Sequence, residues 1–202
     1  MPTCVIIDDI QYDINTDFRV ALECNKVAED NTIGRLERAL AIIYLLFGDK
    51  GLNNQKHHEK LLEYAKKYLS CGKTEEEFEK QKKEQKFELD FDKCVGLIKS
   101  SFKFDYQYDP YAKEYLHWYE FNNDLMNLST SEFGTCCALN RMLSILNEDP
   151  QQIKDSKNKN SLIEAQKELK KKYCIEEQKE ITKEQQELLN KVYEAFGLRK
   201  EW

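Results

Sequence analysis

The chain has 202 residues with a formal net charge of −6, and it contains 41% hydrophobic and 34% charged residues but only 7 glycines and 3 prolines. This composition excludes a loop-rich β-sandwich and favours a helical protein with long solvated faces, and the length is sufficient to bury a hydrophobic core. An acidic chain repels phosphate backbones, so nucleic-acid binding would require a local basic patch.

The cysteine pattern and the N-terminus indicate a cytoplasmic protein. The seven cysteines are odd in number, dispersed and without a CxxC pair, as expected for reduced thiols. The N-terminus lacks a charged segment followed by an apolar run, and the longest apolar stretch, residues 39–47, is too short to span a bilayer. We therefore expect a soluble intracellular protein without membrane contact.

The N-terminal third predicts a β-hairpin followed by helices. Val5–Ile7 and Ile10–Ile14 flank the acidic pair Asp8-Asp9, and the second segment alternates apolar and polar side chains like a half-buried strand. Three helices are then expected. The first covers residues 18–30 and is capped by Asn15 or Thr16. The second covers residues 33–47, is capped at Asn31-Thr32 and ends at Gly48, and the third covers residues 55–69.

A charged segment separates the two halves of the chain. Residues 73–86 hold five lysines, five glutamates and a single large apolar side chain, Phe78. They are interpreted either as a solvated helical extension or as a disordered connector. A further helix is predicted from Phe91 to Phe102, and Pro110 interrupts the pattern because proline disfavours a helical conformation at the preceding residue.

Residues 111–128 form the densest aromatic stretch and are predicted to be the central helix. Trp118, Phe121, Leu125 and Leu128 recur at i, i+3, i+7 and i+10, which places them along one helical face. A buried aromatic ring removes about 150–250 Å² from water, so each contributes several kcal/mol. We therefore expect this helix to have neighbours on several sides.

The C-terminal part predicts three more helices and a polar loop. Ser129 and Glu132 match a capping box for a helix that ends near residue 146, and residues 147–161 are expected to be a loop. Residues 162–175 and 181–198 are expected to be amphipathic helices. The apolar stripe of the second helix consists of Leu188, Leu189, Val192 and Phe196.

These elements predict a mainly α fold with seven or eight helices and a small N-terminal β-hairpin. The expected divisions are residues 1–72 for the hairpin and first helices, 73–86 for the connector, 87–147 for an aromatic-rich helical core, and 148–202 for the polar loop and C-terminal helices. The last division is either separate or part of one domain with residues 1–147.

No constellation of residues points to an enzyme, a cofactor or a metal. His57 and His58 are adjacent and would project about 100° apart on a helix, whereas a helical zinc pair needs i, i+4 spacing, so both are expected to be solvated. His117 has no nucleophile tied to it by spacing and is interpreted as a structural histidine. No phosphate-binding glycine loop or GxSxG motif is present in the sequence.

Two charged stretches are interpreted as solvated surface. The aspartates at 8, 9, 13 and 17 lack the glycine and the closing glutamate of a cation-binding loop. Lys154–Lys172 contains seven lysines against three acids, without an arginine to read base edges or an interleaved aromatic ring to stack on bases.

Several stretches, in order and at characteristic spacing, carry a resemblance to a known family. They are Tyr12–Arg19, Glu37–Leu40 with Tyr44–Gly48, Cys71–Lys73, Phe87–Asp92, and Leu116–Phe121 with Leu125, Leu128 and Phe133-Gly134. Together they cover roughly residues 5–173 and resemble the tail assembly chaperones of siphophages that infect Gram-positive bacteria. The box Leu116-His117-Trp118 is the most specific piece, and residues 181–202 have no counterpart.

The resemblance implies a non-catalytic assembly factor. Such chaperones bind the hydrophobic helices of the tape measure protein, keep it soluble and recruit tail tube protein subunits. They act in the host cytoplasm and are absent from the mature virion. Capture of a helix in a groove depends on apolar anchors at helical spacing, and an acidic surface keeps the complex soluble.

Four aromatic residues are the expected partner-binding side chains, and they are Trp118, Tyr119, Tyr111 and Tyr115. The alternative for each is a role in the hydrophobic core. Self-association is a further expectation, because copies that each bind a long partner weakly can hold it firmly when many of them act together. The rival function is a small helical regulator that binds nucleic acid through Lys154–Lys172.

Overall fold

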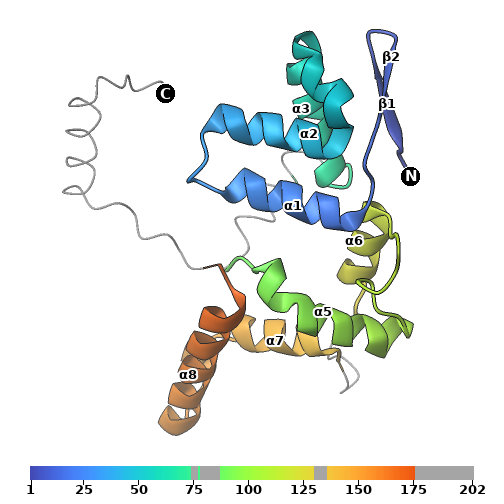
Figure 1. The fold of residues 1–202 in the computed structure, drawn as a ribbon. Helices are drawn as coiled ribbons and strands as arrows, with labels where there is room; N and C mark the ends of the chain where they lie inside the picture. The colour runs from blue at the N-terminus through green and yellow to red at the C-terminus, as the bar shows by residue number, and fades with distance from the viewer. Residues whose placement is uncertain (74–76, 78–86, 130–135, 176–202) are drawn as a thin grey trace, which may run out of the picture.

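The structure is a computed structural model that describes residues 1–73, 77, 87–129 and 136–175. Its elements are β1 (Cys4–Ile7), β2 (Ile10–Asp13), α1 (Phe18–Glu29), α2 (Arg35–Asn53), α3 (His58–Leu69), α5 (Phe91–Tyr106), α6 (Trp118–Met126), α7 (Ala138–Asn147) and α8 (Ser156–Tyr173), with 3-10 turns at Gln55–His57 and Pro150–Gln152. Within the described residues, seven α-helices and one hairpin confirm the predicted fold class. Figure 1 shows α1–α3 grouped on one side, α5–α7 on the other, and α8 extending away from α7.

The hairpin forms as predicted, and its turn sets the register. β1 and β2 are antiparallel with Ile7 opposite Ile10, so Asp8-Asp9 is a two-residue turn. Both aspartates have positive φ angles, 48° and 63°, as a type I′ turn requires. Tyr12 is fully buried against the helices, whereas Ile6 on the opposite face is 66% exposed. Because side chains alternate between the two faces of the hairpin, one face packs against the helices and the other faces solvent.

The expectation that His57 is solvated is wrong. Its ring is buried because the hairpin lies over it, and its Nδ1 shares a 2.7 Å hydrogen bond with the hydroxyl of Tyr12. The Asn54 amide donates to the same hydroxyl at 2.7 Å, which leaves the Tyr12 proton free to be donated to His57. His57 Nε2 then lies 3.3 Å from the Asp8 carboxylate. This network joins the hairpin to the start of α3.

The N-cap of helix α1 differs from the prediction. Asp17, rather than Asn15 or Thr16, is the N-cap, and its carboxylate accepts a hydrogen bond from the Arg19 amide at 2.9 Å. A carboxylate at this position also interacts favourably with the positive end of the helix dipole. The Thr16 hydroxyl is 2.6 Å from the hydroxyl of Tyr115, so a tertiary contact occupies the predicted cap.

Helix α2 differs from the prediction at both ends. It starts after Gly34 rather than at Asn31-Thr32, because the Asp30 carboxylate accepts from the Thr32 amide and holds a separate turn. Gly48 has a φ angle of 63°, as expected for a helix-ending glycine, but helical turns resume after it as far as Asn53. Gly51 then packs so closely that an added Cβ would lie 2.6 Å from the Cβ of Phe47.

The predicted helix over residues 111–128 is wrong in its first part, because α6 begins only at Trp118. The Phe18 amide donates to the Leu116 carbonyl at 3.0 Å, and the Trp118 amide donates to the Thr16 carbonyl at 2.8 Å. Arg19 adds hydrogen bonds from its guanidinium to backbone carbonyls of residues 111–114. Distant partners therefore occupy the backbone groups that helical hydrogen bonds would need.

The interpretation of His117 as a structural histidine is confirmed. It is the N-cap of α6, and its Nδ1 accepts a hydrogen bond from the Tyr119 amide at 3.0 Å. Its Nε2 lies 3.3 Å from the Pro2 carbonyl, to which it donates in this tautomer. Leu116, His117 and Trp118 are all buried, so this box joins the N-terminal residues to α6.

The core is built around stacked aromatic rings from both groups of helices. Phe18 of α1 stacks on Phe121 of α6 with ring centroids 4.2 Å apart, and Phe102 of α5 stacks on Phe121 at 5.5 Å. All three rings are fully buried. One cluster of buried side chains extends from Ile7 to Cys174, so α1–α3 and α5–α7 share a core.

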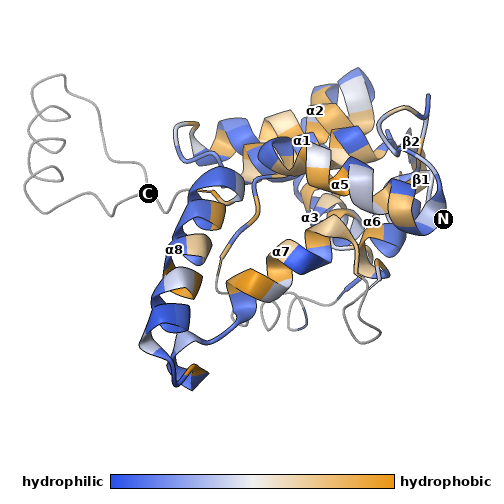
Figure 2. Ribbon diagram, turned by 90° about the horizontal axis from the view of Figure 1, so that it is seen from below, coloured by the Kyte–Doolittle hydropathy of each residue, from blue (hydrophilic) through white to orange (hydrophobic). Residues whose placement is uncertain are grey.

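The C-terminal elements show a further difference from the prediction. Residues 147–161 are not loop throughout, because Asp155 caps a helix that starts at Ser156 and runs to Tyr173. No residue of α8 is buried, and Figure 2 shows that the helix is mostly hydrophilic. The predicted helix start at Ser129 is wrong, because α7 begins at Ala138 and Cys137 is its N-cap. Residues 130–135 lie outside the described residues, as do the predicted helix 181–198 and most of the connector 73–86. No helix in the described ranges is long and apolar enough to cross a membrane.

The cysteines provide a test of this packing. Burial raises the pKa of Cys24 to about 12 and that of Cys94 to about 11, so neither forms an appreciable thiolate near pH 8. Cys4 and Cys136 are only partly buried. We expect a thiol reagent to label Cys4 and Cys136 in the native protein and to label Cys24 and Cys94 only after unfolding, as mapped by peptide mass spectrometry. Rapid native labelling of Cys24 would contradict the core described above.

Candidate functional site

The four predicted partner-binding aromatics differ in their surroundings. Trp118 is 5% exposed, and its indole donates to the Leu69 carbonyl at 3.1 Å. Tyr111 and Tyr119 are half-buried, and burial raises the pKa of each to about 12. Tyr115 is 53% exposed. Of these four side chains, Tyr115 alone presents most of its ring to solvent.

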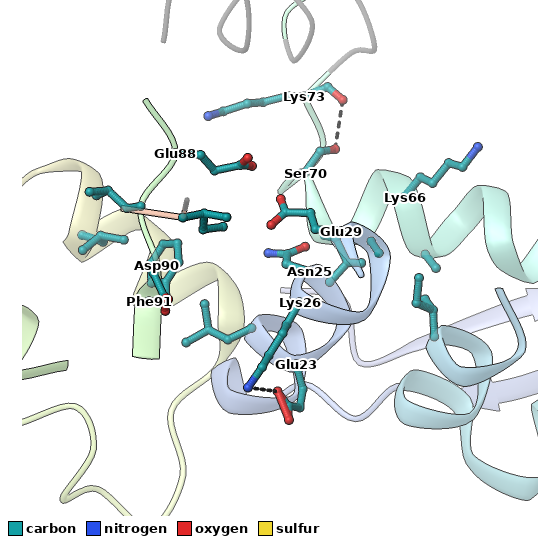
Figure 3. A pocket seen from close by; sticks show the side chains of 18 of the residues that line it. Glu23, Asn25, Lys26, Glu29, Lys66, Ser70, Lys73, Glu88, Asp90 and Phe91 are labelled. Carbon is teal, nitrogen blue, oxygen red and sulfur yellow. Dashed lines mark hydrogen bonds and ion pairs between the residues drawn. The ribbon is translucent and has the colours of Figure 1, made fainter. Parts of the chain in front are cut away.

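A second candidate surface is a groove elsewhere on the molecule. A groove of about 1980 Å³ runs between α1, α3, α7 and the segment 87–92 (Figure 3). We call it the apolar groove, because its floor is made by half-buried apolar side chains from these elements, namely Leu22, Leu62, Leu69, Phe87, Leu89 and Leu143. Sites for small molecules usually measure roughly 300–1,000 Å³, so the dimensions of this groove favour a polypeptide segment.

Charged side chains surround the apolar floor. The α3 side carries Lys66, the opposite side carries Glu88 and Asp90, and Glu23 lies on α1 beside Lys26 (Figure 3). Lys26 joins α1 to the start of α5 through a 2.7 Å ion pair with Asp92, and the hydrogen bond to Asp92 raises the pKa of Lys26. An apolar centre with a polar, mixed-sign rim is the usual anatomy of a protein–protein interface.

The residues that follow α8 contribute Ile175 to one wall of the apolar groove. The Asp90 amide donates to the Tyr173 carbonyl and the Ile175 amide donates to the Glu88 carbonyl, both at 2.9 Å. These bonds flank an antiparallel bridge between Leu89 and Cys174. Ile175 lines the groove and is 40% exposed.

The described residues contain no group of three or more histidine, cysteine, aspartate or glutamate side chains arranged to hold a metal ion. The lysines of α8, which carry the rival nucleic-acid hypothesis, lie on an exposed helix; Lys170, Lys171 and Lys172 are clustered at its C-terminal end.

Sequence reasoning missed the apolar groove because its floor comes from four segments far apart in the chain. Each leucine of the floor belongs to the ordinary amphipathic pattern of its own helix. Such a pattern does not indicate which part of the apolar face neighbouring helices leave uncovered. A usable signal was present in the alternation of Phe87, Leu89 and Phe91 directly after the charged connector. In the structure Phe87 and Leu89 lie on the groove floor before α5 begins at Phe91.

The fold and the groove define a mainly helical protein with an apolar groove on its described surface. The chain belongs to the bacteriophage Gp15 protein family, whose model matches residues 1–173. It is therefore a phage protein of the structural or morphogenesis type. No curated protein and no solved structure matches the chain. The family match ends at the last residue of α8, so residues 174–202 lie beyond it.

Proposed function

We propose that this phage protein is a tail assembly chaperone that binds the tape measure protein and promotes assembly of the tail tube. The observation that carries the proposal is the apolar groove, which has a volume of about 1980 Å³ and a floor of half-buried leucine and phenylalanine side chains. An amphipathic helix docks in such a groove through anchors at i, i+3, i+4 and i+7. Long hydrophobic helices of a tape measure protein present these anchors repeatedly.

Binding in the apolar groove is expected to be of modest strength for one copy. Burial of apolar surface contributes roughly 25 cal/mol/Å², but ordering a helix and its partner offsets much of this gain. Several copies on one long tape measure protein would then act together, while each site stays weak enough to release as tube subunits arrive. The net charge of −6 supports solubility of such a complex.

The proposal includes further partners and a location. The tail tube protein and other copies of this chain are the additional partners, and the host cytoplasm during assembly is the place of action. The mature virion is proposed to lack the protein. Quantitative mass spectrometry of purified particles checks this point, since a constant number of copies per virion would indicate a structural component instead.

Co-expression with a tape measure segment from the same phage tests the function. The segment is expected to be insoluble alone and to co-elute with this protein in size-exclusion chromatography, with more than one copy per segment by light scattering. An unrelated amphipathic helix of equal length and charge serves as the control. A tape measure segment that stays insoluble, or elutes without this protein, would overturn the proposal.

A gel-shift titration separates the proposal from the nucleic-acid alternative. Each phosphate neutralised by a lysine makes binding depend more steeply on salt. The lysines of α8 project from a protein with a net charge of −6, so we expect no duplex binding above about 100 mM salt. Tight, sequence-selective binding that is lost on replacing Lys170, Lys171 and Lys172 with glutamine would favour the regulator.

A further inference from the structure

The alternation of hydrogen bonds in the hairpin determines which backbone groups point away from it. The two-residue turn is closed by Ile7 and Ile10, which makes them a hydrogen-bonded pair. Hydrogen-bonded pairs then recur at every second residue, and the Ile14 amide agrees with this phase by donating to the Thr3 carbonyl at 2.9 Å. The even-numbered residues of β1, at positions 4 and 6, therefore direct their backbone N–H and C=O groups away from β2.

The two edges of the hairpin differ in their surroundings. On the β2 side, the Asn15 amide donates to the Leu46 carbonyl at 2.8 Å, and β2 packs beside α2. On the β1 side, the outward backbone groups of Cys4 and Ile6 form no hydrogen bond within the described part of the chain. The Ile6 side chain is 66% exposed, and β1 has no charged residue or proline that would discourage pairing with another strand. Figure 1 shows the hairpin at the edge of the molecule.

We propose that β1 pairs antiparallel with β1 of a second copy of this chain. In the register that places the two Val5 residues opposite each other, Cys4 of each copy faces Ile6 of the other, and these pairs form four backbone hydrogen bonds. A register shifted in either direction forms fewer. In one shifted register Ile6 faces Pro2, which has no N–H, and in the other Cys4 faces Asp8, a turn residue with a φ angle of 48°.

A second copy is the occupant that this edge fits. Two-fold symmetry supplies a strand with the same row of donors and acceptors, and the two apolar strands meet without opposing like charges. On the solvent-facing side of the hairpin, Ile6 of each copy covers Cys4 of the other. The pairing occupies the open edge of both copies, whereas the β2 edges adjoin α2, so assembly through this surface ends at a dimer.

The dimer specifies the self-association within the proposed function, on which its biological role rests, although the pairing itself needs no tape measure protein. Val5 and Ile7 line the apolar groove in each copy. Because Val5 lies at the two-fold axis, the two grooves adjoin there, and a long helix can contact both. The pairing buries less area than a standard interface, so the dimer is weak in solution and is favoured where copies gather on one partner.

Sedimentation equilibrium of the full-length chain, without a tape measure segment, tests the pairing. We expect the average mass to rise from the 24.0 kDa of the monomer toward twice this value between about 5 and 500 μM. Ile6→Lys charges the strand edge and is expected to raise the dimer dissociation constant at least roughly tenfold. Gln11→Lys adds the same charge on the same face but on β2, and it is expected to dimerise like the parent. A monomer at every concentration, or equal effects of both substitutions, would overturn the pairing.

A disulfide scan tests the register. Val5→Cys in a Cys4→Ser background places the two introduced thiols in a non-hydrogen-bonded pair with Cα atoms about 4.5 Å apart, which is within the range for a disulfide. Oxidised glutathione is expected to join two copies at position 5, as mapped by peptide mass spectrometry. Leu36→Cys in the same background, at a 69% exposed position on α2, is expected to form at least roughly tenfold less dimer.

Equal yields of covalent dimer from Val5→Cys and Leu36→Cys would overturn the register, provided that both variants keep the urea midpoint of the parent protein. The two proposals fail separately. A chain that stays monomeric but still binds a tape measure segment would overturn the pairing alone. A chain that dimerises through β1 but leaves the tape measure segment insoluble would overturn the proposed function and leave the pairing in place.

Discussion

Replacing Phe121 with alanine is expected to lower the free energy of unfolding by about 3–5 kcal/mol, which is the usual cost of removing a buried phenylalanine. Phe121 stacks on Phe18 from α1 and on Phe102 from α5, so its loss leaves a cavity where the two groups of helices meet. Its ring is fully buried, and the neighbouring rings are held on separate helices that cannot readily close the space.

Equilibrium urea denaturation measures this effect. Phe104→Ala is the matched control, because Phe104 lies on α5 but is 55% exposed, and its replacement is expected to change stability by less than about 0.5 kcal/mol. Equal losses for Phe121→Ala and Phe104→Ala would show that the stacked rings are not the centre of the core.

Replacing Leu62 with aspartate is expected to weaken binding of a tape measure segment at least roughly 30-fold, the effect of losing one interface hot spot. Leu62 lies half-buried on the floor of the apolar groove, and a carboxylate there would be desolvated by any apolar partner. Fluorescence anisotropy of a labelled segment gives the dissociation constant. Leu36→Asp adds the same charge on α2, away from the groove, and is expected to bind like the parent protein.

Folding of each binding variant is checked by its urea midpoint. Met126→Asp provides a second groove substitution at a 60% exposed position, where the cost to stability is small. Unchanged affinity in both Leu62→Asp and Met126→Asp would exclude the groove as the tape measure site.

Local patterns predicted the elements whose hydrogen bonds and caps are close in sequence. The acidic pair Asp8-Asp9 between alternating segments predicts a hairpin, and the structure has it with both residues at positive φ. The helical spacing after Phe91 predicts α5, where Asp90 accepts hydrogen bonds from the amides of Asp92 and Lys93. In these elements the stabilising partners are at most a few residues apart, so periodicity and capping preferences are sufficient.

Distant partners explain the largest differences. Residues 111–117 have helical spacing of aromatic side chains, yet pairing with Thr16–Phe18 and hydrogen bonds from Arg19 hold them in a non-helical conformation. His57 is buried in the structure, where it shares a hydrogen bond with Tyr12, 45 residues earlier. A tertiary hydrogen bond that satisfies a buried polar group outweighs the small free-energy differences of local propensity.

By itself the sequence determined the mainly α class, the N-terminal hairpin and, through its resemblance, the assignment to phage. Tertiary structure alone decided that half-buried side chains of α1, α3, α7 and residues 87–89 surround one groove. The physical reason is that periodicity reports which face of each helix is apolar. How completely neighbouring helices cover that face depends on their packing, and the part left uncovered is available to a partner.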